Sequence, residues 1–81
     1  MMISAVLVAT LPEHVDETRA AVAAHEWADV HHVESEKGRI IATIEAATTH
    51  EATARILELR NLPHILLAEM VEHFVDDEAG K

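Results

Sequence analysis

The chain lacks several residue types on which common chemistries depend. It has no cysteine and no tyrosine, and its two glycines, Gly38 and Gly80, stand far apart in 81 residues. Without cysteine there can be no disulfide, thiolate nucleophile or cysteine-ligated metal centre. Isolated glycines cannot form a phosphate-binding loop, and no Gly-x-Ser-x-Gly motif is present. We therefore expect neither an enzyme nor a bound cofactor.

Basic residues are also scarce. The chain has 6 lysines and arginines against 15 aspartates and glutamates, which gives a net charge of −9 with histidine neutral. Proteins that bind nucleic acid neutralise phosphates with clustered lysine and arginine. We therefore expect no nucleic-acid partner. An acidic protein attracts cations or basic peptides instead.

Long hydrophobic runs are absent as well. No run approaches the ~18 apolar residues of a membrane span, and the apolar start of the chain lacks the basic leader of a secretory signal. We expect a cytoplasmic protein with no membrane partner. At 49% hydrophobic residues the chain is too apolar to be disordered. Its length suits one domain, residues 1–75, followed by an acidic, flexible tail over 76–81.

The hydrophobic pattern predicts four strands and two helices. The turn Glu36-Lys37-Gly38 between two apolar runs indicates a hairpin, and Thr48 with Glu51 forms a capping box. The predicted strands are Ile3–Thr10, Asp29–Ser35, Arg39–Glu45 and Ile65–Phe74, and the predicted helices run from Pro12 to Ala24 and from the N-cap Thr48 to the stop at Pro63.

This order of elements is typical of an α+β, ferredoxin-like βαββαβ fold. Right-handed crossovers then give a four-stranded antiparallel sheet of order 4-1-3-2, with both helices on one face. The second face of the sheet has no element of the chain left to cover it. It is either exposed for a partner or packed against a second copy of the chain.

Alternation along the strands assigns residues to the two faces of the sheet. Both sides of the first strand are apolar, so the pattern alone leaves its orientation open. The residues expected to face the helices are Val6, Val8, Ile40, Ala42, Ile44, Ala68 and Met70. Those expected on the uncovered face are Ala5, Leu7, Ala9, Ile41, Thr43, Glu45, Glu69, Val71 and His73. An apolar centre rimmed by acids and a histidine is typical of an interaction site.

Seven histidines raise the question of a metal site. His31 and His32 are adjacent on a predicted strand, so their side chains should point to opposite faces and not chelate one ion. The histidines near helix ends and loops show no i, i+4 pairing; they are His14, His25, His50 and His64. We therefore expect no metal site. His73 either contacts a partner or senses pH, or it simply caps an edge strand.

Four segments together resemble one protein family. They are Ile3–Val8, Glu36–Ile41, Ile44–Ala46 and Val71–His73, and in this order and spacing they resemble the NapD family from about Ile3 to Asp77. Members are cytoplasmic chaperones for the catalytic subunit of periplasmic nitrate reductase. The resemblance places the glycine of the family's hairpin at Gly38 and its terminal histidine at His73.

The resemblance implies a specific function. Family members have a ferredoxin-like fold and bind the twin-arginine signal peptide of the reductase precursor, holding back export until the molybdenum cofactor is inserted. The peptide is expected to dock as a helix on the uncovered face, and we expect a monomer. With the peptide on the uncovered face, the expected signal-peptide-binding residues are those assigned to that face by alternation: Ala5, Leu7, Ile41, Thr43, Glu45, Glu69, Val71 and His73.

Two other classes of protein share the fold. A dimeric ferredoxin-like module that senses a small molecule would bury the same face between two copies. A metal-handling domain of the metallochaperone type normally uses a paired-cysteine loop, which is absent here. The first alternative stays open on the sequence alone.

Overall fold

Strands and helices follow one another in the order that the sequence predicts. The structure, a computed structural model, describes residues 2–75, with side chains up to Val71. The predicted tail over 76–81 lies outside the described residues. The elements are β1 (Met2–Ala9), the 3-10 helix η1 (Pro12–His14), α1 (Val15–Ala23), β2 (Ala28–Glu34), β3 (Arg39–Ala46), α2 (Thr49–Arg60) and β4 (Leu67–Val75).

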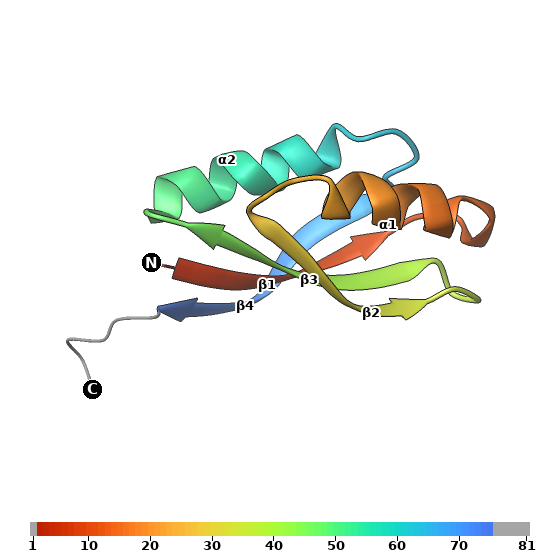
Figure 1. Ribbon diagram of the computed structural model, residues 1–81, viewed down its shortest axis with the longest axis horizontal. Coiled ribbons are helices and arrows are strands. Elements are labelled where there is room, and N and C mark those ends of the chain that lie inside the picture. The colour runs from red at the N-terminus through yellow and green to blue at the C-terminus, as the bar shows by residue number, and fades with distance from the viewer. Residues whose placement is uncertain (1, 76–81) are drawn as a thin grey trace.

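The four strands form one sheet of order β2-β3-β1-β4. All three pairings are antiparallel. Both helices lie on the same side of the sheet, as Figure 1 shows. The ferredoxin-like fold and the strand order 4-1-3-2 are thereby confirmed.

The start of α1 differs from the prediction, and that of α2 differs in one hydrogen bond. Pro12 begins a separate 3-10 turn, and α1 proper starts only at Val15. At α2, Thr48 Oγ1 accepts from the Glu51 N–H at 3.1 Å, as a capping box requires. The Glu51 carboxylate returns to the N–H of Ala47 at 2.7 Å rather than to that of Thr48. The cap is therefore confirmed, with its second bond one residue earlier.

The core lies between the sheet and the helices. The inner positions of β1, β3 and β4 are fully buried as predicted, and α1 and α2 contribute an apolar stripe each. These residues are Val6, Val8, Ile40, Ala42, Ile44, Ala68, Val22, Ile56 and Leu59. Met70 was also expected to face the helices, and its pairing with the buried Val6 places it on that side of the sheet. It is nevertheless 38% exposed, because β4 is an edge strand with a neighbour on one side only.

Two irregularities interrupt the edge strands. In β2, Val30 pairs with Ala42 and His32 with Ile41, so His31 is an extra residue. In β4, Met70 pairs with Val6 and Glu72 with Ala5, so Val71 is extra. Such bulges increase the local twist and change which face the following side chains occupy. They alter the composition of the uncovered face.

Gly38 ends the β2–β3 turn where the chain contacts the end of β1. Its φ of +69° lies in the left-handed region, and its carbonyl accepts from the Thr10 N–H at 2.7 Å. A Cβ at this position would overlap the Thr10 carbonyl oxygen. Only glycine fits both requirements.

We expect Gly38→Ala to lower the free energy of unfolding by at least about 1–3 kcal/mol, which is the cost of a strained backbone position. The overlap of the new Cβ with the Thr10 carbonyl oxygen adds to this cost. Lys37→Ala in the same exposed turn should change it by less than about 0.5 kcal/mol. Urea unfolding measures both values. Equal stability of the two variants would contradict the assigned turn geometry.

Candidate functional site

The side of the sheet away from α1 and α2 is the candidate functional site, and we call it the open face. Its positions on β1 and β3 alternate with fully buried residues, which confirms the orientation of the first strand. All the residues of β1 and β3 that were expected on the uncovered face are partly exposed: Ala5, Leu7, Ala9, Ile41, Thr43 and Glu45. In the described chain no helix covers them (Figure 1).

The centre of the open face is apolar. Leu7 stands opposite Ile41 across the β1–β3 ladder. Next to them, Ala9 pairs with Leu67 of β4, whose side chain is 39% exposed. Contiguous exposed apolar positions on a folded domain indicate an interaction surface.

Charged residues stand around this centre, and they are unevenly distributed. Asp29 lies opposite Thr43, and Glu45 opposite Ile3, near the start of β1. Near the end of β1, Arg39 and Glu34 face each other, so their charges offset. The start of β1 is therefore the more acidic end of the open face.

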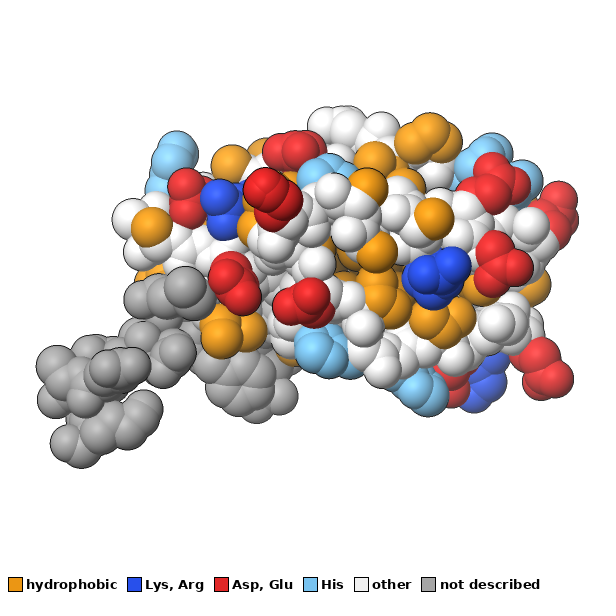
Figure 2. Space-filling view, viewed as in Figure 1, with side chains coloured by type: hydrophobic (Ala, Val, Ile, Leu, Met, Phe, Trp, Pro, Cys, Tyr) orange, Lys and Arg blue, Asp and Glu red, His pale blue; other side chains and the backbone are white. Residues whose placement is uncertain are grey.

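The acidic surplus is not confined to the ends of the open face. The exposed Glu69 of β4 stands opposite Leu7, between the two ends. Figure 2 shows acidic side chains spread along the side in view, with few basic ones among them. Together with the net charge of −9, this distribution favours a cationic partner.

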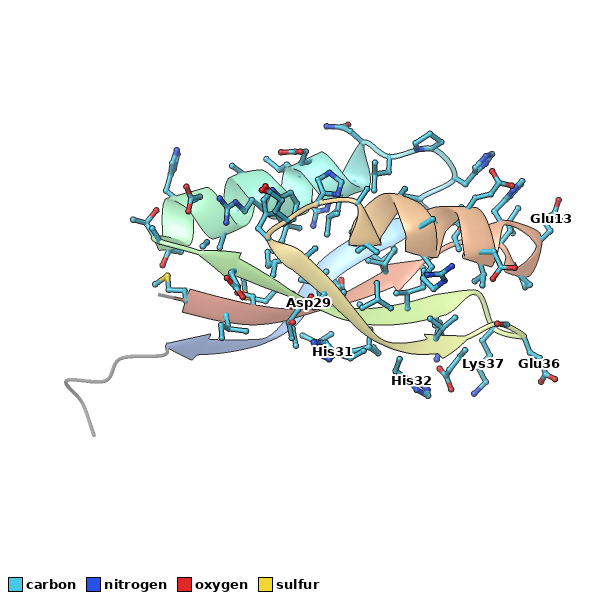
Figure 3. All side chains as sticks on the ribbon, viewed as in Figure 1. Glu13, Asp29, His31, His32, Glu36 and Lys37 are labelled. Atoms are coloured by element: carbon cyan, nitrogen blue, oxygen red, sulfur yellow. The ribbon has the colours of Figure 1, made fainter. Side chains whose placement is uncertain are left out.

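The β2 bulge places both neighbouring histidines on the open face. His31 Nε2 lies 2.7 Å from Thr43 Oγ1, and His32 pairs with Ile41. In Figure 3 both rings lie on the side of the sheet away from the helices, together with Asp29. The expectation that they point to opposite faces is wrong, because the extra residue breaks the alternation. The sequence carries no clear signal for this bulge.

The β4 bulge affects two predicted binding residues. Val71 is 54% exposed and has no partner in the ladder, while residue 72 stands opposite Ala5 and residue 73 opposite the inner-face Ser4. The simple alternation that put Glu69, Val71 and His73 on one face is therefore wrong beyond Met70. The side chain of His73 lies outside the described ones, and its role stays a prediction.

An open pocket of about 450 Å³ lies at the acidic end of the sheet. It is lined by Glu26, Trp27, Glu45 and Arg55. The Arg55 guanidinium lies 5.3 Å from the centre of the Trp27 ring and donates to the Glu45 carbonyl. Trp27 packs against the core, and the pocket adds the Glu26 carboxylate to this end.

A second group of polar side chains lies on the helix side, at the opposite end of β1. His14, Glu17 and His64 bring potential ligand atoms within 4.8 Å of one another. Sequence spacing missed this group because only His14 and Glu17 are close along the chain. His64 comes from the loop between α2 and β4, and nothing in the sequence indicates that it returns to α1.

Comparison with known protein families tests the resemblance that four segments of the sequence suggest. Residues 1–77 match the family described as NapD protein. The chain belongs to the NapD family. A search of curated proteins gave no match. None of the helices in the described part of the chain is long and apolar enough to cross a membrane.

Two solved structures share the fold of this chain. The solution structure of the Tat proofreading chaperone NapD from E. coli superimposes with a TM-score of 0.82 at 18% identity, over 94% of this chain and 80% of that one. The crystal structure of a hypothetical protein from Pyrococcus horikoshii gives a TM-score of 0.77 at 19% identity, over 96% and 94% of the two chains. At these identities the superpositions show the shared fold.

Proposed function

We propose that this NapD-family protein is a cytoplasmic, non-enzymatic chaperone that binds a twin-arginine signal peptide on the open face. Family membership and the fold shared with a Tat proofreading chaperone support the proposal. The observation that carries it is the uncovered sheet face with Leu7 and Ile41 at its centre. A twin-arginine signal joins a basic stretch to an apolar one, and the open face offers carboxylates beside an apolar surface.

Apolar contact supplies most of the affinity. An exposed arginine–carboxylate pair contributes only ~0–1 kcal/mol, whereas burying one large aliphatic side chain contributes about 1.5–3 kcal/mol. The signal peptide docks as a helix whose i, i+3 and i+4 side chains contact the apolar centre. The net charge of −9 mainly speeds the encounter, and salt slows it.

The uneven rim sets the direction of the bound peptide. Near the start of β1, Asp29, Glu45 and the pocket-lining Glu26 supply three carboxylates against the one guanidinium of Arg55, so this end keeps an excess of negative charge. The paired arginines bind at this end, and the apolar segment extends over Leu7 and Ile41 toward Leu67. This direction keeps the basic stretch away from Arg39, which lies at the other end.

Binding of the signal peptide on the open face has a consequence for export. A signal peptide held on the open face is not available to the export machinery. We propose the precursor of the periplasmic nitrate reductase catalytic subunit as the partner, released once its molybdenum cofactor is inserted. The chaperone works as a monomer, because a dimer formed through the open face would cover the binding surface.

Calorimetric titration with a twin-arginine signal peptide should give one site per chain at low salt. Replacing both arginines of the peptide by lysine should weaken binding, because lysine cannot form the planar two-point contact of a guanidinium with a carboxylate. Light scattering of the free protein should give the mass of one chain. No binding to the folded protein, or a stable dimer that covers the open face, would overturn the proposal.

Two neighbouring isoleucines separate binding from folding. Ile40 is fully buried, while Ile41 is partly exposed on the open face. We expect Ile40→Asp to unfold the domain, because an unpaired buried carboxylate costs several kcal/mol. Ile41→Asp should stay folded by circular dichroism and lose peptide affinity by about tenfold or more. If Ile41→Asp bound the peptide normally, the assigned face would be wrong.

The proposed direction has a charge-matched test. Replacing Asp29 and Glu45 by Asn and Gln should weaken peptide binding roughly threefold to tenfold, since each exposed contact contributes up to ~1 kcal/mol. Glu34→Gln with Glu36→Gln removes the same net charge at the far end of β2 and its turn. This control should change affinity less than about twofold. A larger loss of affinity in the Glu34 and Glu36 control than in the Asp29 and Glu45 variant would show that the peptide binds in the opposite direction.

A further inference from the structure

Three side chains from separate segments meet beside the start of α1, away from the open face. His14 belongs to η1, Glu17 to the first turn of α1, and His64 to the loop before β4. One nitrogen of each imidazole and one carboxylate oxygen lie within 4.8 Å of one another. This arrangement serves no step of the proposed peptide binding.

The Glu17–His14 separation matches that of two metal ligands, the Glu17–His64 separation is slightly longer, and both exceed a hydrogen-bond distance. Glu17 Oε1 lies 3.5 Å from His14 Nδ1, and Glu17 Oε2 lies 3.8 Å from His64 Nε2. Hydrogen bonds between such atoms measure about 2.7–3.2 Å. Tetrahedral ligands at ~2.0–2.2 Å from one Zn²⁺ stand about 3.3–3.6 Å apart.

His14 carries an independent sign that a partner belongs here. Its Nδ1 is buried and has no hydrogen-bond partner among the described residues. Buried polar side-chain atoms are nearly always satisfied by protein, water or an ion. A metal ion at this nitrogen would supply the missing interaction.

The backbone holds His64 in place for this role. Its φ of +69° is unusual for a residue other than glycine, and Thr10 Oγ1 donates to its carbonyl at 2.6 Å. Thr18 of α1 in turn donates to Thr10 at 3.4 Å. The loop is thereby tied to both β1 and α1, and strained positions fixed in this way often mark functional sites.

One local movement is required before both rings can bind an ion. The imidazoles of His14 and His64 are stacked, with centroids 3.7 Å apart and planes inclined by 8°. A ring nitrogen binds a metal in its own ring plane, so two stacked rings cannot point to one ion. The His64 side chain is 40% exposed, against 25% for His14, and its ring is the one free to turn.

We propose that His14, Glu17 and His64 bind one Zn²⁺, with water at the fourth position. Two imidazoles and one carboxylate are ligands that Zn²⁺ takes, whereas Mg²⁺ and Ca²⁺ prefer oxygen alone. The nearby carboxylate of Glu13, 3.7 Å from His14, adds attraction for a cation. The ion clamps the α2–β4 loop to α1 and stabilises the folded chain, since binding favours the native state.

Calorimetric titration with Zn²⁺ tests the site on the full chain. We expect one ion per chain and no competition from excess Mg²⁺. His14→Gln, Glu17→Gln and His64→Asn should each weaken Zn²⁺ binding by more than roughly 100-fold. Removing a side chain that only hydrogen-bonds to a metal ligand costs roughly tenfold to 100-fold, and removing the ligand itself should cost more. Asn is chosen at position 64 because it tolerates positive φ.

A matched control separates this site from scattered histidines. His50 is exposed on α2, so His50→Gln should leave Zn²⁺ affinity unchanged. In NMR spectra, Zn²⁺ should shift the ring signals of His14 and His64 as the stack opens. Absence of binding, affinity equally lost in His50→Gln, or affinity retained in the three ligand variants would each overturn the site. None of these results bears on peptide binding.

Discussion

The two helices of this fold cover only one face of the four-stranded sheet, and the rest of the account depends on the face that they leave uncovered. Both helices pack on one side (Figure 1), where Val6, Ile40 and Ile44 are fully buried. The adjacent Leu7 and Ile41 stay partly exposed, although they are as apolar as their neighbours. The hydrophobic effect therefore stabilises one face by folding and leaves the other apolar and partly exposed, which is the basis of the proposed peptide binding.

Charge determines which partner suits that face. The acidic surplus of the sequence is not spread evenly over the open face, because Arg39 offsets Glu34 at one end while Asp29 and Glu45 have no basic neighbour in the ladder. An apolar strip with one acidic end matches a peptide that is basic at one end and apolar beyond it. This match in charge and polarity is the physical basis of the proposed signal-peptide partner.

The regular parts of this fold could be predicted from the sequence, and the irregular parts could not. Alternation gave the right faces for β3, and the orientation chosen for β1, whose two sides are both apolar, is also right; the pairing of these two central strands runs without interruption. It failed at His31 and Val71, where extra residues in the edge strands shift the register. A bulge depends on the local twist between two strands, which periodicity along one strand does not record.

Contacts between residues far apart along the chain could not be predicted from the sequence either. The hairpin glycine was evident from its turn, but its contact with Thr10 follows only from the packing of the turn against β1. In the same way, His14 and His64 meet because a loop residue adopts a positive φ that its neighbours enforce. No spacing rule for histidines contains that information.

The central claim is that the uncovered face of the sheet is the binding surface. It is tested most directly by NMR spectra of the ¹⁵N-labelled protein during addition of a twin-arginine signal peptide. The account predicts that the largest amide shifts fall on β1 and β3 around Leu7 and Ile41, with the exposed sides of α1 and α2 nearly unchanged. Shifts concentrated on the helices, with β1 and β3 unaffected, would contradict it.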